Sequence, residues 1–509
     1  LQRMRTLSVQ AINDTNSSTD RQALNNEVVE LKAEINRIAN TSAFNNIPLL
    51  KDGYSGTFQI GHKAGQTIDL ELNDASTSSL GAYTTHASTS PTMVNIDGGY
   101  SASMDLSSLD GSNGFRLDGV DADDYSGKSV SNAGDINNDG YDDVIIGAYR
   151  ADPNGGGSGG SYVVFGKASG WSASLDLSSL DGSNGFRLDG VDAGDWSGGS
   201  VSSAGDVNND GYDDVIIGAY TADPDGKSSA GESYVVFGKA SGWNASLDLS
   251  SLDGSNGFRL DGVDAGDNSG KSVSNAGDIN NDGYDDVIIG AYKADPNGGN
   301  SGESYVVFGK ASGWNASLDL SSLDGSNGFR LDGVDVADYS GISVSSAGDV
   351  NNDGYDDVII GAYLGDPNAN ASGESYVVFG KASGWNASLD LSSLDGSNGF
   401  RLDGVDATDY SGWSVSNAGD INNDGYDDVI IGAYKADPNG SNSGESYVVF
   451  GKASGWSASL DLSSLDGSNG FRLDGVDADD WSGWSVSNAG DINNDGYDDV
   501  IIGAHTADP

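Results

Sequence analysis

Apolar residues follow two different patterns along this chain, and the pattern changes near residue 100. Between residues 20 and 40 the apolar positions are three or four residues apart, which places them on one face of an α-helix. They are Leu24, Val28, Leu31, Ile35 and Ile38. From Ser101 onward, short β-branched runs such as DVIIGAY and YVVFG, each bounded by Gly, Asp, Asn or Ser, predict strands. The chain is therefore expected to begin with helices and to continue as a β structure.

The apolar stripe of the first segment is narrow, so this helix is expected to pack against another helix. No partner of suitable length occurs later in the 509 residues, so we expect the partner in another subunit or in a further part of the chain. The sequence starts without methionine and stops in mid-repeat at Pro509, which indicates a fragment. Residues 74–100 are rich in Ser, Thr and Gly without periodicity and predict a linker between residues 1–73 and 101–509.

Residues 101–509 consist of a repeat whose copies begin 71 or 72 residues apart. Each unit contains the runs SVS, DVIIGAY, YVVFG and FRLDG, which predict four strands, here called A, B, C and D. Four strands per unit at this period are typical of a β-propeller, in which each unit forms one blade. The first FRLDG (115–119) precedes the first A strand, and the sixth unit stops before its C strand. In a closed ring this unpaired D strand is expected to complete the last blade.

The A and B strands are joined by the nine residues DINNDGYDD, which first occur at Asp135–Asp143. Oxygen-bearing side chains at positions one, three, five and nine can converge on one hard cation if the backbone turns sharply. Gly140 at position six permits that turn. Position seven then offers its backbone carbonyl, which completes the all-oxygen ligand set that Ca²⁺ prefers. An EF-hand would need Glu at position twelve, where this chain has Ile146, so a calcium loop at the tip of a β-hairpin is predicted.

The motif occurs six times, and the same five positions are predicted as calcium ligands in every copy. These residues are Asp135, Asn137, Asp139, Tyr141 and Asp143; Asp206, Asn208, Asp210, Tyr212 and Asp214; Asp278, Asn280, Asp282, Tyr284 and Asp286; Asp349, Asn351, Asp353, Tyr355 and Asp357; Asp420, Asn422, Asp424, Tyr426 and Asp428; and Asp491, Asn493, Asp495, Tyr497 and Asp499. The alternative is a plain polar turn, which uses the same residue types. A plain turn needs only two or three of them, whereas the acidic positions and the Asn hold in all copies while flanking loops drift.

The composition limits the classes of binding partner and of function. The 77 acidic and 24 basic residues leave a formal charge of −53, which argues against binding to nucleic acid or to an anionic membrane surface. No apolar run approaches the roughly 18 residues that span a bilayer, and the chain contains no cysteine. The three histidines, His62, His86 and His505, occur in unlike contexts, and no catalytic triad or zinc-ligand spacing is present, so we do not expect an enzyme.

Two family resemblances cover most of the chain. The series LQRMRTLSVQAINDTNSSTDRQALNNEVVELKAEINRIANTSAFNNIPLL, continuing to about residue 70, resembles the inner N-terminal domain of bacterial flagellins. This resemblance implies helices that form the wall of a filament by self-association through residues 1–73, followed by a β-hairpin at 58–60 and 67–72. It also implies a variable outer domain inserted at about the position of the linker. The chain departs from the family pattern at SVQ, where alanine is commoner, and at NNIPLLKDG, where the family usually has a tighter Asn-Gly turn.

The repeat series SG-x-SVSxAGDINNDGYDDVIIGAY…YVVFG resembles the FG-GAP repeats of integrin α-subunits and bacterial surface proteins. The resemblance implies a calcium-binding β-propeller and favours seven blades for the complete ring. Tyr149 stands where that family usually has proline. The predicted fold class is thus mainly β, an FG-GAP propeller preceded by an α-helical flagellin-like segment.

Alternating strand directions place the calcium loops and the C-to-D connections on one face of the disc. The B-to-C and D-to-A loops then lie on the other face, and these are the segments that differ between copies. Aromatic residues appear there at Tyr125, Trp196, Tyr339, Tyr410, Trp413, Trp481 and Trp484. Such a face suits a glycan or a protein ligand, although loops also drift without selection. The regularly spaced Trp171, Trp243, Trp314, Trp385 and Trp456 of the C-to-D connection are interpreted as packing residues.

Three functions are compatible with these patterns. The leading hypothesis is an extracellular structural subunit of a bacterial flagellar filament that carries a calcium-binding, adhesive propeller as its outer domain. The second is a secreted or cell-surface calcium-dependent adhesin in which the helices form a stalk. The third is the accessory domain of a secreted hydrolase. A second helical region, an anchoring signal or a catalytic motif elsewhere in the full-length protein would distinguish the three.

Overall fold

The computed structural model describes residues 31–32, 37, 43–44, 47–48, 54–59, 67–72 and 104–507. The chain divides into two compact units, Leu1–Met104 and Asp105–Pro509. In the first unit, Leu31, Lys32 and Arg37 are helical, as the apolar stripe predicts, and the other residues of the predicted helix lie outside the described residues. The predicted linker, 74–100, also lies outside them.

Four strands are described in the first unit. They are β1 (Ala43–Phe44), β2 (Ile47–Pro48), β3 (Tyr54–Gln59) and β4 (Thr67–Leu72). Strands β3 and β4 pair antiparallel, with Tyr54 opposite Leu72 and Gln59 opposite Thr67. This pairing is the β-hairpin implied by the flagellin resemblance, and its first strand is longer than the predicted 58–60 segment.

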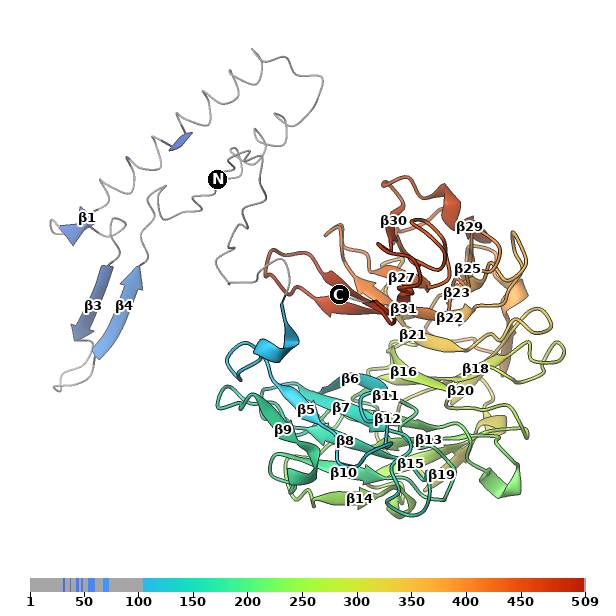
Figure 1. Ribbon diagram of the computed structural model, residues 1–509, viewed down its shortest axis with the longest axis horizontal. Helices are drawn as coiled ribbons and strands as arrows, with labels where there is room; N and C mark the ends of the chain where they lie inside the picture. The colour runs from blue at the N-terminus through green and yellow to red at the C-terminus, as the bar shows by residue number, and fades with distance from the viewer. Residues whose placement is uncertain are drawn as a thin grey trace, which may run out of the picture. The chain divides into compact units, whose positions relative to one another are not determined.

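The second unit consists of blades that follow one another around a common centre (Figure 1). Blade 1 contains β6 (Ser129–Gly134), β7 (Asp143–Ala148), β8 (Gly160–Val164) and β10 (Gly185–Asp189); blade 2 contains β11 (Ser200–Gly205), β12 (Asp214–Ala219), β13 (Glu232–Val236) and β15 (Gly257–Asp261); blade 3 contains β16 (Ser272–Gly277), β17 (Asp286–Ala291), β18 (Glu303–Val307) and β20 (Gly328–Asp332). Blade 4 contains β21 (Ser343–Gly348), β22 (Asp357–Ala362), β23 (Glu374–Val378) and β25 (Gly399–Asp403); blade 5 contains β26 (Ser414–Gly419), β27 (Asp428–Ala433), β28 (Glu445–Val449) and β30 (Gly470–Asp474); blade 6 contains β31 (Ser482–Gly490) and β32 (Asp499–Ala504). Each complete blade is an antiparallel sheet in the order A, B, C, D, which confirms the predicted strands.

A short fifth strand joins consecutive blades. These strands are β9 (Ser174–Asp176), β14 (Ser246–Asp248), β19 (Ser317–Asp319), β24 (Ser388–Asp390) and β29 (Ser459–Asp461), and each is followed by a single 3₁₀ turn. Strand β14 belongs to the C-to-D connection of blade 2 but pairs in parallel with the D strand of blade 1, so that Arg187 lies opposite Ser246. The same pairing recurs at the following junctions. The C-to-D connection is therefore an interlock between blades.

The 3₁₀ turns have short, regular bounds. They are η1 (Leu106–Ser108), η2 (Leu177–Ser179), η4 (Leu249–Ser251), η5 (Leu320–Ser322), η6 (Leu391–Ser393) and η7 (Leu462–Ser464), with η3 (Pro224–Gly226) in a B-to-C loop. The turn η4 begins where Asp248 accepts a hydrogen bond from the N–H of Ser250 at 2.9 Å, which caps its first turn. The series SLDLSS thus forms a strand and then a turn within six residues.

The apolar core lies between blades. From blade 1, Ile145, Val163 and Phe186 face blade 2, and from blade 2, Val215 and Ile217 face blade 1. Equivalent clusters fill the next three junctions. Alternate residues of each B strand therefore contact different neighbours, which explains why DVIIGA is apolar on both of its faces.

The first D strand does not join the last blade within the described residues. Strand β5 (Arg116–Asp118) pairs in parallel with β9, so it takes the D position of a blade that would precede blade 1. Val130 is 62% exposed while Val201, in the same position of blade 2, is 4% exposed. At the other end Ile501 is 60% exposed while Ile430 is fully buried. The described blades thus form an arc with an uncovered apolar face at each end. The prediction that β5 completes the last blade applies to a closed ring, and it stays a prediction.

Candidate metal loops and the opposite aromatic face

Each predicted calcium loop connects an A strand to a B strand. In blade 2 the register shifts between Ser203 and Gly205, which forms a β-bulge just before the loop. Gly205 has φ +68, a conformation that glycine adopts without strain. The bulge turns the chain, so that Asp206 at position one points back over the loop.

The carboxylate at position one organises the backbone of its own loop. Asp206 accepts hydrogen bonds from the N–H groups of Asp210 at 3.0 Å and Gly211 at 2.8 Å, and Asp210 accepts one from the N–H of Tyr212 at 3.1 Å. The same three bonds occur in the other copies. Positions one and five, and the backbone of position seven, therefore lie in one tight turn.

The carboxylate at position nine is buried beneath that turn. Asp214 accepts hydrogen bonds from the N–H of Gly238 at 2.8 Å and from the N–H of Val207 at 3.1 Å, and it is fully buried. Burial raises the pKa of Asp214 well above its ordinary value, despite these bonds. Burial likewise raises the pKa of Asp143 and of Asp428 to about 7.

The amide at position three supplies an oxygen with no partner. The Oδ1 atoms of Asn208, Asn280 and Asn351 are buried and accept no hydrogen bond. A buried oxygen without a partner is unfavourable by about 1–3 kcal/mol, so it needs a hydrogen-bond donor or a cation. These oxygens, together with the buried carboxylate at position nine, are chemically suited to a hard cation such as Ca²⁺.

The structure does not bring all the predicted ligands into one cluster. Among the described residues, no three His, Cys, Asp or Glu side chains lie together as a metal-binding group. The carboxylates at position one are directed to backbone N–H groups, as described above. The sixth loop is the most open, since Ile492 at its second position is 61% exposed whereas Ile136 is fully buried.

The face opposite the predicted calcium loops carries a series of neighbouring aromatic rings, here called the aromatic ladder. Its members are Tyr125, Tyr149, Trp196, Tyr220, Tyr292, Tyr339, Tyr363, Tyr410, Trp413, Tyr434, Trp481, Trp484 and His505. Trp196 lies between Tyr149 at 5.9 Å and Tyr220 at 5.6 Å, so the contacts cross from blade to blade. In blade 3, Asn268 takes the place of the D-to-A ring, and its Nδ2 donates to the carbonyl of Tyr220 at 2.9 Å.

The D-to-A aromatics of this ladder follow from the sequence, whereas the residue after strand B was predicted to belong to that strand. That residue is tyrosine in blades 1 to 5 and His505 in blade 6. In each of the first five blades the ring contacts aromatic or cationic side chains on its own blade or the next. Its recurrence at the end of VIIGAY was the signal that could have found it.

Several rings of the ladder stand on strained backbone. Tyr125, Trp196, Tyr339, Tyr410 and Trp481 have φ between +53 and +59. Left-handed backbone is rare for bulky side chains and common for Asn, the residue that blade 3 uses at this place. The turn therefore does not require an aromatic residue, and strain of this kind is concentrated at functional sites.

Most basic side chains of the repeats are paired with carboxylates or with aromatic rings. The D-strand arginines pair with aspartates two residues on, as Arg259 does with Asp261, and the lysine before each C-to-D tryptophan lies over its ring. The aromatic ladder holds Lys128, Arg150, Lys271, Lys293 and Lys435. Lys271 lies 4.6 Å from the Tyr220 ring centre, and burial lowers its pKa. Positive charge on this face is thus already held by aromatic rings.

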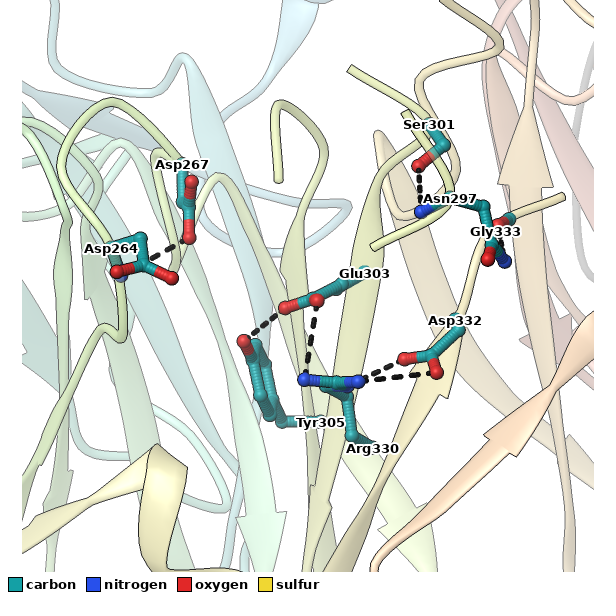
Figure 2. A network of polar contacts seen from close by, with 9 residues as sticks. All are labelled: Asp264, Asp267, Asn297, Ser301, Glu303, Tyr305, Arg330, Asp332 and Gly333. Atoms are coloured by element: carbon teal, nitrogen blue, oxygen red, sulfur yellow. Dashed lines mark hydrogen bonds and ion pairs between the residues drawn. The ribbon is translucent and has the colours of Figure 1, made fainter. Parts of the chain in front are cut away.

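A polar network lies at the start of each C strand from blade 2 to blade 5. Figure 2 shows it in blade 3, where the Tyr305 hydroxyl donates to Glu303 and Arg330 bridges Glu303 and Asp332. Glu303 is buried, and burial raises its pKa although Tyr305 and Arg330 act in the opposite direction. Asp267 is buried nearby; burial first, and then the charge of Glu303, raise its pKa to about 7.

Comparison with known proteins identifies both parts of the chain. The bacterial flagellin N-terminal helical region matches residues 1–55. The FG-GAP repeat matches residues 126–164, 197–236, 269–307, 340–378, 411–449 and 482–508. The chain therefore carries a flagellin N-terminal region followed by six FG-GAP repeats, which form the blades described above.

Individual relatives match the N-terminal part. B-type flagellin of Pseudomonas aeruginosa is 46% identical over 84 residues, which are 16% of this chain and 17% of that protein. Flagellin A of Vibrio cholerae is 48% identical over 73 residues, 14% of this chain and 19% of its own length. Flagellin of Salmonella muenchen is 37% identical over 81 residues, 16% of each chain. The chain thus spans between 16% and 19% of the length of these relatives.

The part of the chain that the structure describes contains no helix long and apolar enough to cross a membrane.

Proposed function

We propose that this chain is part of an extracellular subunit of a bacterial flagellar filament whose outer domain is the FG-GAP propeller. The observation that carries the proposal is the order of the parts: the flagellin match at residues 1–55 is followed by the β3–β4 hairpin and then by the repeats. Residues 1–73 would self-associate with neighbouring subunits. The repeats would then be displayed once per subunit.

Immunogold electron microscopy of intact cells tests this proposal. An antibody against the B-to-C segment of blade 2, TADPDGKSSAGE, is specific because the other copies differ there. Label along flagellar filaments is expected. Label confined to the cell body would support the adhesin alternative, and label only in the medium would support a secreted accessory domain.

We also propose that the loops bind Ca²⁺ through positions one, three, five, seven and nine. Bound calcium would supply positive charge to the carboxylates of each loop. The unpartnered Oδ1 atoms of Asn208, Asn280 and Asn351 and the buried carboxylate of Asp214 support this proposal. We expect the weak affinity of extracellular calcium modules, with dissociation constants near about 10⁻⁴ to 10⁻³ M.

The aromatic ladder supports an adhesive role for the opposite face. Several of its rings are carried on left-handed, strained backbone. Asn268 occupies the same position in blade 3, so the fold also accepts a polar residue there. Flat apolar rings with polar edges suit a sugar ring, and the acidic charge of the chain favours a neutral glycan over an anionic one. Binding to an array of neutral and acidic glycans is the direct test. A signal only on protein-coated surfaces would favour a protein ligand instead.

A further inference from the structure

The aspartate at position eight of the loops was not predicted to bind metal, and in blades 2 to 6 the structure gives it a partner in the preceding blade. Asp285 Oδ2 accepts a hydrogen bond from the backbone N–H of Asp206 at 2.7 Å. The same bond joins Asp213 to Asp135 at 2.7 Å, Asp356 to Asp278 at 2.8 Å, Asp427 to Asp349 at 2.8 Å and Asp498 to Asp420 at 2.9 Å. Position one of a loop is thus held by position eight of the loop in the following blade.

Three further contacts tie the same pair of loops. The N–H of Asp285 donates to the carbonyl of Asp206 at 3.3 Å, so the two aspartates are bonded reciprocally. The amide of Asn209 donates to the carbonyl of Gly283 at 2.6 Å, and the N–H of Lys310 donates to the carbonyl of Val207 at 2.9 Å. The backbone that places the predicted ligands of one loop is therefore fixed by the next blade.

The glycine before each loop leaves room for this contact. A Cβ atom at Gly205 would lie 2.2 Å from Asp285 Oδ2, and one at Gly277 would lie 2.3 Å from Asp356 Oδ2. Gly490 precedes the loop of blade 6, which no described blade follows, and a Cβ there would meet nothing within 4 Å. The close approach therefore depends on the neighbouring aspartate and not on the hairpin itself.

The first copy provides an internal reference. Asp142 has no preceding loop among the described residues, and it is exposed. Asp285, Asp356 and Asp427 are partly buried in the corresponding position. The carboxylates that repel Asp285 are those of Asp356, Asp206 and Asp213, all in metal loops. The position-eight carboxylate is thus placed where the occupancy of its own loop and of the preceding loop both change its energy.

We propose that the aspartates at position eight, Asp213, Asp285, Asp356, Asp427 and Asp498, are positioning residues that couple adjacent metal loops along the arc. An ordered loop fixes its position-eight aspartate, which in turn fixes the backbone of position one in the preceding loop. Calcium binding in one blade then favours calcium binding in the neighbouring blade, and by linkage the effect is reciprocal. This inference rests on the proposed calcium function, and it adds a coupling residue to that function.

The test compares Asp285→Ala with Asp142→Ala in the full chain. Asp285→Ala leaves all five predicted ligands of loop 206–214 unchanged, and Asp142→Ala removes the equivalent carboxylate where it has no partner. Hydrogen exchange is followed in peptides that run from loop 206–214 into the distinct segment 221–231, with and without calcium. Asp285→Ala should speed exchange in this loop about tenfold, since a hydrogen bond to a charged group is lost, while Asp142→Ala should leave it unchanged.

Calorimetric calcium titration provides the second measurement. The unchanged chain should give a steeper calcium-binding isotherm than Asp285→Ala. In the hydrogen-exchange experiment, Asp285→Asn should recover most of the protection, because it keeps an acceptor oxygen. Equal protection of loop 206–214 in Asp285→Ala and in the unchanged chain would overturn the coupling. Absence of calcium uptake by the unchanged chain would refute the metal function, and calcium uptake with identical isotherms in all variants would refute the coupling alone.

Discussion

The indole of Trp243 stacks on the ring of Phe186 with centroids 4.0 Å apart and planes 7° apart, although the two residues belong to consecutive blades. Lys239 covers the other side of the indole at 4.3 Å, and Trp243 Nε1 donates to the carbonyl of Lys239 at 3.1 Å. The C-to-D tryptophans are therefore packing residues, as interpreted from their regular spacing. They fasten one blade to the D strand of the blade before it.

Removal of such a tryptophan should destabilise the repeat region. Trp243→Ala is expected to lower the free energy of unfolding by about 3–5 kcal/mol, because it opens a cavity at a buried stack. Trp171→Ala is the control, since Trp171 is only partly buried and stacks on Phe115 outside a complete blade. Denaturant unfolding followed by tryptophan fluorescence measures both. Equal losses for the two variants would contradict an interlock between blades.

Calcium should stabilise the repeats. At about 100-fold excess over the dissociation constant, each site adds about 2.7 kcal/mol if the unfolded chain does not bind the ion. Thermal melts with calcium should therefore lie clearly above melts with chelator. Magnesium at equal concentration is the control for ionic strength, because it prefers a stricter six-coordinate geometry. Superimposed calcium and chelator curves would contradict metal binding.

Ladder residues can be replaced by those that the chain itself uses at the same positions. Tyr410→Asn copies Asn268, and Trp413→Ile copies Ile342, so neither variant should unfold the blade. Tyr410→Asn relieves left-handed strain of about 1–2 kcal/mol and loses ring contacts of about 0.5–1.5 kcal/mol, so its stability should change little. Both variants should lose glycan binding. Tyr141→Ala, on the opposite face, is the control and should keep glycan binding. Glycan binding retained by Tyr410→Asn and Trp413→Ile would exclude the ladder as the adhesive surface.

Stability should fall as the pH rises through the acidic range. The pKa of Asp267 and of Asp409 is raised from 3.8 to about 7 by burial, so the folded chain holds these protons over a pH range where the unfolded chain has released them. The free energy of unfolding then decreases between about pH 4 and pH 7 and levels off above. Melting temperatures without calcium should be higher at pH 5 than at pH 7.5.

Matched substitutions identify the groups responsible for this pH dependence. Asp267→Asn should stabilise the chain at pH 7.5 more than at pH 5, because the neutral amide avoids ionisation in a buried place. Asp324→Asn is the control, because hydrogen bonds from Ser326 lower the pKa of Asp324, so this carboxyl is ionised at both pH values and its replacement should change stability equally at pH 5 and pH 7.5. A pH profile unaltered by Asp267→Asn would show that this carboxyl is ionised in the fold.

The uncovered ends of the arc should promote association of this chain. Val130 and Ile501 are exposed although their counterparts are buried between blades. Val130→Glu and Ile501→Glu together should reduce the aggregate fraction in light scattering, because both apolar faces then carry charge. Val336→Glu, at an exposed valine away from the ends, serves as control. A monodisperse unchanged chain would show that these faces do not associate.

Much of this architecture could be predicted from local patterns. The bounds of strands A to D follow from β-branched runs between turn residues, and the β3–β4 hairpin follows from family resemblance. The pairing of β14 with β10 could not be predicted, because SLD is a short polar run whose partner lies in another repeat. The contact of Asp285 with Asp206 was hidden for the same reason: a ligand motif describes one loop and not its neighbour.

The aromatic ladder shows a different limit. Tyr220 ends a run that reads as a strand, and only the three-dimensional order of the blades places it against Trp196. The strain at Trp196 depends on its φ of +55, which no composition rule reveals. Periodic sequence therefore predicts what each unit contains, whereas contacts between units require the assembled arc.

The junctions between blades are chemically alike, from the stacked tryptophan to the paired aspartates of neighbouring loops. A gain or loss of one whole repeat in the gene would consequently join two surfaces that already fit, and no new contact would have to evolve at the seam. Unequal recombination between the near-identical copies can thus change the reach of the outer domain in single steps. The segments outside the junctions, such as 221–231, are then free to diverge after each duplication.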